Sequence, residues 1–299
     1  MASLNLLYSP AYARLQDSFS VWLQTLGYAP TTVYNLPRHI SEYLRWQEHQ
    51  GNVTLDSLTA SSANAFISHQ QLQTGIRTKR NHSAGHLNKY VQALALLGRY
   101  LRQTGAGGEG FALRQVAGEK RLPVWLTVEE VRQLYHVTGD TVLGIRDRAM
   151  LAVFYGCGLR LNEGTSLEIS DILTDRRLLY VRKGKGYKER YVPLTQQNLQ
   201  HIQDYLSESR PQLLQRSTES LFLGANTGKG LSKQSLYVRV KQLAKTAGII
   251  KDIGTHTLRH SIATHLLQNG VPLEKIQLFL GHESLDSTQL YTHLVNGSL

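Results

Sequence analysis

Four segments in the second half of the chain carry polar side chains that together suit phosphoryl transfer. A guanidinium group presents a planar fork of donors, so two arginines can clamp the non-bridging oxygens of a phosphodiester, where charge accumulates in the transition state. A lysine can donate a proton to a leaving oxygen, and histidines can relay protons near neutral pH. A tyrosine phenol becomes a nucleophile once neighbours withdraw its proton. The residues of these types are Arg160, Lys185, His256, Arg259, His282 and Tyr291.

The spacing of these residues supports this interpretation. Arg259 follows His256 by three positions, which predicts that both lie on one face at the start of a helix. Lys185 lies between two glycines in a turn that two predicted strands flank. Tyr291 follows a helix start predicted at Ser287, so it is expected on a short element that can move.

Single residues of this set also have plainer interpretations. Arg160 taken alone would be an ordinary surface arginine, and only the other three segments favour a functional role. Lys185 shares its turn with Lys183 and Lys188, so a solvated basic hairpin remains an alternative. Tyrosine is plentiful, with 15 in the chain, so Tyr291 is distinguished by its neighbours and not by its type.

A metal site is a further alternative. His256 and His260 are four residues apart, a spacing that zinc ligands also use on helices. No glutamate directly follows His256, however, and Arg259 would crowd a cation. We therefore expect no metal site and no cofactor. His265 and His293 are expected to be structural.

Helices are the main elements that must position these groups. In the first hundred residues, apolar side chains recur at helical spacing from Leu15 to Leu26, and Pro30 starts a second helix. A further helix is predicted over 87–101. The sequence thus predicts a helical N-terminal domain over residues 1–104. Four glycines in the stretch 105–110 end it and predict a linker over 105–121.

The second domain is predicted over residues 122–299. Thr127 and Glu130 have the spacing of a capping box at the start of its first helix. Residues 178–182 and 190–194 read as two strands joined by a basic, glycine-bearing turn, and helices return from His256 onward. The fold class predicted is mainly α with a small antiparallel β-sheet, the second domain being mixed α/β.

Composition favours a polyanionic partner. The 299 residues carry a net charge of +11, with 12 Lys and Arg against 6 Asp and Glu in residues 1–121, and 21 against 16 beyond. The single cysteine, Cys157, excludes an intramolecular disulfide and is expected to pack in the core. No apolar run approaches the roughly 18 residues of a membrane span. These features predict a soluble protein of the cytoplasm that does not bind membranes.

The motifs resemble those of the tyrosine recombinases, also called phage integrases. Gly-Leu-Arg-x-x-Glu at 158–163, the glycine-flanked lysine, His-x-Leu-Arg-His at 256–260 and Leu-Gly-His at 280–282 occur in the order of that family. Gly-Lys-Gly-x-Lys-Glu-Arg-x-Val-Pro-Leu at 184–194 and Tyr-Thr-His at 291–293 are similar to Xer-type members. The resemblance spans most of 122–299, and more loosely covers the N-terminal part as a helical core-binding domain.

The resemblance implies a role for each site residue. Arg160 and Arg259 would bind the scissile phosphate, and Lys185 would be the general acid toward the leaving 5′ oxygen. His256 would help to take the tyrosine proton, and His282 would donate to a phosphate oxygen. Tyr291 would form a 3′-phosphotyrosine without metal or ATP, and Glu163 would support the site from behind.

The partner implied is double-stranded DNA with specific recombination sites, in the nucleoid. The protein would act as a homotetramer on DNA, or as a heterotetramer with a paralogue. Only eight residues follow Tyr291, fewer than Xer-type relatives usually have, which places a tail exchange between protomers in question. Basic residues expected to contact DNA are Arg77, Lys79, Arg80, Lys89, Lys183 and Lys188.

Three rival functions remain open at this point. A type IB topoisomerase or a telomere resolvase would share phosphotyrosine chemistry. A DNA-binding regulator could have lost catalysis, although the intact polar set argues against it. A metal-dependent nuclease would be sensitive to EDTA.

Overall fold

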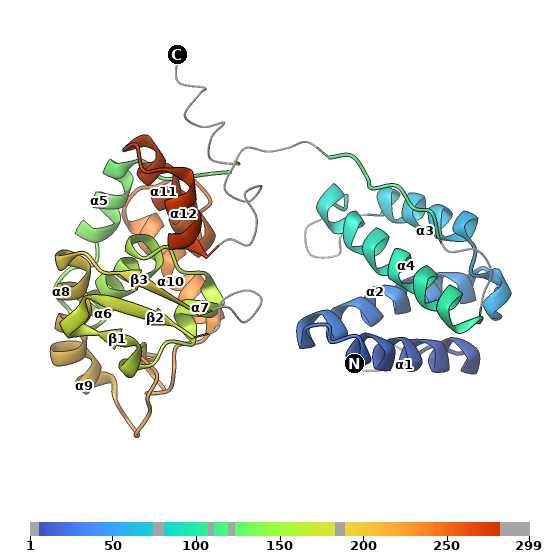
Figure 1. The fold of residues 1–299 in the computed structure, drawn as a ribbon, viewed down its shortest axis with the longest axis horizontal. Coiled ribbons are helices and arrows are strands. Elements are labelled where there is room, and N and C mark those ends of the chain that lie inside the picture. The colour runs from blue at the N-terminus through green and yellow to red at the C-terminus, as the bar shows by residue number, and fades with distance from the viewer. Residues whose placement is uncertain (1–5, 74–80, 107–110, 119–122, 183–188, 282–299) are drawn as a thin grey trace, which may run out of the picture. The chain divides into compact units, whose positions relative to one another are not determined.

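The computed structural model describes residues 6–73, 81–106, 111–118, 123–182 and 189–281 (Figure 1). The chain divides into two compact units, Met1–Arg121 and Leu122–Leu299. Both are built mainly from helices, and the second also contains a small antiparallel sheet, so the predicted fold class is confirmed.

In its described residues the N-terminal unit contains four α-helices, α1 (Pro10–Thr25), α2 (Pro30–His49), α3 (Ala60–Leu72) and α4 (Ala84–Thr104), and a 3-10 turn at Leu55–Ser57. The apolar spacing located α1, and Pro30 occupies the first turn of α2 as predicted. Helix α3 was not predicted, because its apolar side chains do not form a regular stripe at helical spacing; Ala63, Phe66 and Ile67 are the buried ones.

Aromatic rings fill the core of this unit. Phe66 lies edge-on to both Tyr43 and Tyr90, with ring centroids 5.4 and 5.5 Å apart, and Phe19 lies edge-on to Tyr100 at 5.7 Å. Edge-to-face pairs at such distances add to the free energy gained from burial. These rings come from all four helices, so the unit has a core of its own.

Part of the predicted linker packs against α4. Gly105, at φ 67°, ends that helix in the left-handed conformation that glycine tolerates best. Residues 111–118 have no regular secondary structure, as expected of a linker, but Phe111 is buried over Gly98. Asn88 also donates to the Val116 carbonyl and accepts from its amide, at 3.1 and 2.8 Å.

This packing can be tested at Gly98. A Cβ atom there would lie 2.6 Å from the Phe111 amide nitrogen, so Gly98→Ala must push the segment away from α4. We expect a loss of about 1–3 kcal/mol of unfolding free energy, as for other overpacked sites. Thermal and urea unfolding of the full chain would measure it.

Gly85 provides the matched control. It lies on the same helix, and a Cβ atom there would meet nothing within 4 Å. Gly85→Ala is expected to stay within about 1 kcal/mol of the wild type, by helix propensity alone. Equal effects of the two substitutions would contradict the close packing of Phe111.

The C-terminal unit begins with α5 (Val128–His136), whose Thr127–Glu130 capping box is confirmed. Then come α6 (Val142–Leu151), a π-helical turn at Ala152–Gly156, and the short α7 (Leu161–Thr165). After the sheet the chain forms α8 (Gln196–Asp204), a second π-helical turn at Tyr205–Ser209, α9 (Arg210–Leu213), α10 (Lys233–Thr246), α11 (Thr255–Gln268) and α12 (Leu273–Leu280).

The sheet has the order β1–β2–β3, all antiparallel. Its strands are β1 (Ile172–Leu173), β2 (Leu178–Val181) and β3 (Arg190–Pro193). The two predicted strands are confirmed as β2 and β3, with Leu179 opposite Val192. The two-residue β1 was not predicted, because so short a segment carries no periodicity.

Two close contacts fix the segment that runs from the π-helical turn through α7. Gly158 has φ +61°, and a Cβ atom there would lie 2.8 Å from a methyl group of Leu280 on α12. Gly164 packs on the ring of Phe154, where a Cβ atom would lie 2.3 Å away. Glycine at these positions lets the start of α7 approach α12 and the core closely.

Among the helices that the structure describes, none combines the length and apolar character needed to cross a bilayer.

Candidate active site

A buried carboxylate lies at the centre of the candidate site. Glu163 is in the first turn of α7 and has a side chain only 2% exposed. Its Oε2 accepts from the backbone N–H of Arg160, at 2.9 Å, and its Oε1 accepts from Nη1 of the same arginine, at 2.8 Å. The carboxylate therefore caps its own helix and orients the Arg160 side chain.

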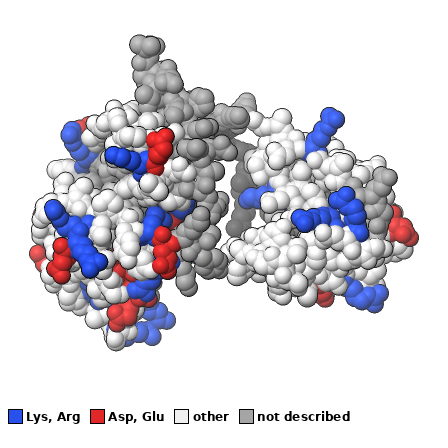
Figure 2. Space-filling view, in the orientation of Figure 1, with Lys and Arg blue, Asp and Glu red and all other residues white. Residues whose placement is uncertain are grey.

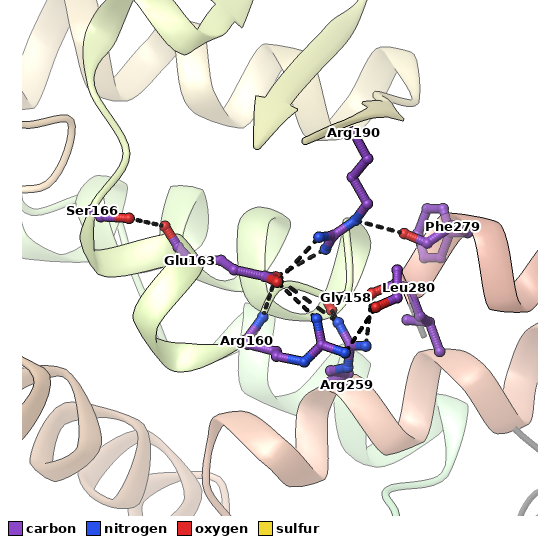
Figure 3. A network of polar contacts seen from close by, with 9 residues as sticks. Gly158, Arg160, Glu163, Ser166, Arg190, Arg259, Phe279 and Leu280 are labelled. Carbon is purple, nitrogen blue, oxygen red and sulfur yellow. Dashed lines mark hydrogen bonds and ion pairs between the residues drawn. The ribbon is translucent and has the colours of Figure 1, made fainter. Parts of the chain in front are cut away.

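Two further guanidinium groups meet this carboxylate (Figure 3). Arg190, at the start of β3, donates from Nη1 to Oε1 at 3.0 Å and from Nη2 to Oε2 at 2.8 Å. Arg259, on α11, brings its Nη1 to 4.0 Å from Oε2. Chain segments far apart in sequence are thus brought around one charged group.

The same three arginines donate hydrogen bonds to the backbone carbonyls at the C-terminal end of α12. Arg190 Nε donates to the carbonyl of Phe279 at 3.3 Å. Arg259 Nη2 donates to Leu280 at 2.8 Å, and Arg160 Nη2 donates to Gly281 at 2.9 Å. The last carbonyls of a helix have no partner within it and carry partial negative charge, so three cations at this end are stabilising.

Electrostatics keep Glu163 ionised. Burial alone would raise its pKa, but the hydrogen bonds and charge of Arg190, together with the backbone and side chain of Arg160, outweigh burial and hold the pKa at about 2. Three guanidinium groups surround this one carboxylate. The cluster therefore keeps an excess of positive charge, which suits an anionic ligand such as a phosphate.

The structure brings together Arg160, Arg259 and Glu163, three of the residues predicted for the site. The side chain of Arg160 is 22% exposed and that of Arg259 is 5% exposed, so Arg160 is the more open to a ligand. Arg259 Nη1 also donates to the carbonyl of Gly158, at 2.6 Å.

Other predicted residues lie at different places or outside the described part. His256 is in the first turn of α11 and exposed, whereas Arg259, three residues on, is buried. Lys89 is exposed on α4 in the N-terminal unit. The predicted site residues that lie outside the described ranges are Arg77, Lys79, Arg80, Lys183, Lys185, Lys188, His282 and Tyr291.

Cys157 and His265, which were expected to have structural roles, are both buried. Cys157 is fully buried, and burial raises the pKa of its thiol to about 12, so it stays protonated. His265 on α11 is buried, and its Nδ1 lies 2.9 Å from the hydroxyl of Tyr155 in the π-helical turn. The described residues include no group of three His, Cys, Asp or Glu side chains able to hold one metal ion.

Arg190 was missed as a site residue. In the sequence it appears as the first residue of a predicted strand and as the arginine of the Xer-like stretch 184–194, with no role assigned to it. One signal was present: side chains alternate along a strand, and Arg190 shares the inward side of β3 with the buried Val192. A charged residue on the inward face of a strand requires a buried partner, which here is Glu163.

Basic side chains lie on both units in the face that Figure 2 shows, while acidic ones gather more on the C-terminal unit. This agrees with the charge excess of both halves of the sequence.

Solved structures with this fold include a recombinase and an integrase bound to DNA. The XerH site-specific recombinase bound to its difH substrate has a TM-score of 0.68 and 24% identity, covering 94% of this chain and 81% of that one. The Tn1549 transposon integrase in complex with circular intermediate DNA has a TM-score of 0.72 and 18% identity, covering 93% and 94%. At such identities the likeness establishes the fold alone.

Sequence relatives establish the family. Residues 124–297 match the phage integrase family. The tyrosine recombinase XerD of Corynebacterium glutamicum is 32% identical over 93% of each chain, and the tyrosine recombinase XerC of Lactobacillus leichmannii is 31% identical over 94% of each. The chain therefore belongs to the phage integrase family and is a site-specific DNA recombinase similar to Xer enzymes.

The depressed pKa of Glu163 predicts an acid-dependent part of stability. A folded-state pKa of about 2, against an ordinary 4.5, corresponds to about 3 kcal/mol. Because the folded value is the lower one, this stabilisation is present above about pH 4.5 and is lost as the pH falls toward 2. About 2 kcal/mol should be lost by pH 3.

Glu163→Gln should lack this part of the pH dependence, measured by urea unfolding between pH 6 and pH 3. The control is Glu168→Gln, which alters a surface ion pair whose two side chains are each 39% exposed and should keep the wild-type slope. A Glu163→Gln slope as steep as the wild type would show that the carboxylate is not held ionised by its neighbours.

Proposed function

We propose that this recombinase cuts and rejoins DNA through a 3′-phosphotyrosine on Tyr291, with Arg160 and Arg259 holding the scissile phosphate. The observation that carries the proposal is the convergence of these two guanidinium groups, from the N-cap of α7 and from α11, on one carboxylate and on the adjacent carbonyls of Leu280 and Gly281. His282 is the next residue in the chain, and Tyr291 follows it by nine positions.

The chemistry is an in-line displacement at phosphorus. The Tyr291 oxygen attacks and forms the P–O bond while the bond from phosphorus to the 5′ oxygen breaks. His256 takes the phenol proton, and Lys185 gives a proton to the leaving oxygen. Attack by the 5′-hydroxyl of a partner strand reverses these steps. The phosphotyrosine bond conserves the energy of the broken phosphodiester bond, so the reaction requires neither ATP nor a metal.

The arginines supply the electrostatic part. Negative charge builds on the non-bridging oxygens in the transition state, and preorganised donors there lower the barrier without reorganising. Each of the two arginines donates to a carbonyl at the end of α12, so both are already held by that end of the helix. His282 would donate to a phosphate oxygen beside them. Glu163 supports this arrangement from behind the phosphate.

DNA binding is proposed to involve both units. The N-terminal helical unit, as a core-binding domain, would grip the duplex with Arg77, Lys79, Arg80 and Lys89, and the catalytic unit with Lys183 and Lys188. Four protomers, of this chain alone or with a paralogue, would act on two duplexes carrying specific recombination sites. The site of action proposed is the nucleoid in the cytoplasm, where such DNA lies, and not a membrane.

A suicide substrate tests the nucleophile. On a nicked duplex carrying the recombination site, the wild type should accumulate a covalent protein–DNA adduct, and Tyr291→Phe should form none because it lacks the attacking oxygen. EDTA should leave the wild-type rate unchanged, since arginines and not a metal neutralise the phosphate. The adduct is measured on denaturing gels.

An adduct formed by Tyr291→Phe, or loss of wild-type activity in EDTA, would contradict the proposed mechanism. Relaxation of supercoiled plasmid without recombinant products would instead favour a topoisomerase. DNA binding by a wild type that forms no adduct would favour a regulator.

Binding is expected to depend steeply on salt. A protein that neutralises six to ten phosphates loses on the order of 10³- to 10⁵-fold in affinity between 50 and 200 mM salt. Fluorescence anisotropy with a labelled site at several salt concentrations measures the slope. A nearly flat slope would rule out a grip by Lys and Arg on phosphates.

A further inference from the structure

Arg190 has no assigned role in the displacement, yet its side chain makes two hydrogen bonds to Glu163, where the side chain of Arg160 makes one. Both of its terminal nitrogens bind the carboxylate, at 3.0 and 2.8 Å, and its Nε donates to Phe279 at 3.3 Å. Its side chain is 11% exposed. A forked donor facing a fork of acceptors fixes the orientation of both groups.

Arg190 also packs against the backbone at the end of α12. Gly281 ends that helix at φ +65°, and a Cβ atom there would lie 2.9 Å from Nη1 of Arg190. A side chain at this position would displace the guanidinium. Arg190 therefore touches both Glu163 and the residue to which Arg160 Nη2 donates.

The charge balance explains why a third arginine matters. A carboxylate has about four lone-pair directions, and Arg190 occupies one on each oxygen of Glu163. Without Arg190, these directions would attract Arg160 and Arg259, whose Nη1 atoms already lie 2.8 and 4.0 Å from the carboxylate. Both guanidinium groups would turn toward Glu163 and away from a ligand.

We infer that Arg190 is a positioning residue for DNA cleavage: by saturating Glu163 and fixing the end of α12, it holds Arg160 and Arg259 where they meet the scissile phosphate. This rests on the proposed function. Arg190 itself touches no reacting atom. A displacement of about 1 Å in such a site costs on the order of 10²-fold in rate.

The test compares Arg190→Gln with the wild type in single-turnover adduct formation on the nicked duplex. We expect a rate about 10²-fold lower, with DNA affinity within about twofold of the wild type, because the substitution misplaces groups that act in the transition state. The Arg148→Gln variant is the matched control. Arg148 is on α6 and donates to the carbonyl of Gly139 at 3.0 Å with a side chain 28% exposed, apart from the cluster, so its rate should stay close to the wild type.

A methylphosphonate at the scissile position separates positioning from a general structural effect. This group lacks the negative charge that the two arginines neutralise, so the deficit of Arg190→Gln should shrink to within about fivefold of the wild type on that substrate. Arg190→Lys keeps the charge but loses the fork. The rate of Arg190→Lys on the phosphate substrate should lie between those of the wild type and Arg190→Gln. If Arg190→Gln does not fold, Arg190→Lys is compared on the two substrates in its place.

A wild-type rate in Arg190→Gln, a loss confined to DNA affinity, or an equal deficit on both substrates in both variants would overturn the role of Arg190 alone. Failure of the wild type to form any adduct would overturn the proposed function, and this role with it. The two failures are therefore distinguishable.

Discussion

The rest of the catalytic unit is arranged around one ionised carboxylate that is almost completely removed from water. Burying a single charge costs several kcal/mol, and so does burying a guanidinium group without a partner. Glu163 and its three arginines are therefore stable only as a set. Each arginine comes from a different element, so the set fixes α7, β3 and α11 relative to one another.

The end of α12 extends this network. Its last carbonyls would otherwise lie unsatisfied near buried groups, and each receives a donor from one of the arginines. The close approach of Gly158 to Leu280 brings the helix within reach. Gly281 ends this helix, and His282 is the next residue in the sequence. The arginines that bind the end of α12 therefore fix the point at which the chain leaves the helix.

Exposure differs within the network in a way that suits a phosphate ligand. Arg160 is the most open of the three arginines, at 22%, while Arg190 and Arg259 are 11% and 5% exposed and Glu163 is 2% exposed. A ligand would reach Arg160 first, with the carboxylate shielded behind it. Glu163 can thus orient the cations without being presented to the DNA, where it would repel phosphate.

The sequence by itself determined the elements with strong local signals. The helix that contains Leu15, the helix that starts at Pro30, the capping box at Thr127, and strands β2 and β3 follow from periodicity and start signals that involve only neighbouring residues. The order of four motifs indicated the family. Helix α3 and strand β1 were not predicted, since one has no regular apolar stripe and the other is only two residues long.

Only the tertiary structure decided which charged groups meet. The motifs singled out Arg160, Arg259 and Glu163, but no local pattern shows that Arg190 binds the same carboxylate, because the two residues are 27 positions apart. Likewise, the glycines after α4 predicted a break, whereas the packing of Phe111 over Gly98 depends on the shape of a folded surface. Spacing along the chain fixes periodicity, but contacts between distant residues arise only when burial, charge and close packing are satisfied together.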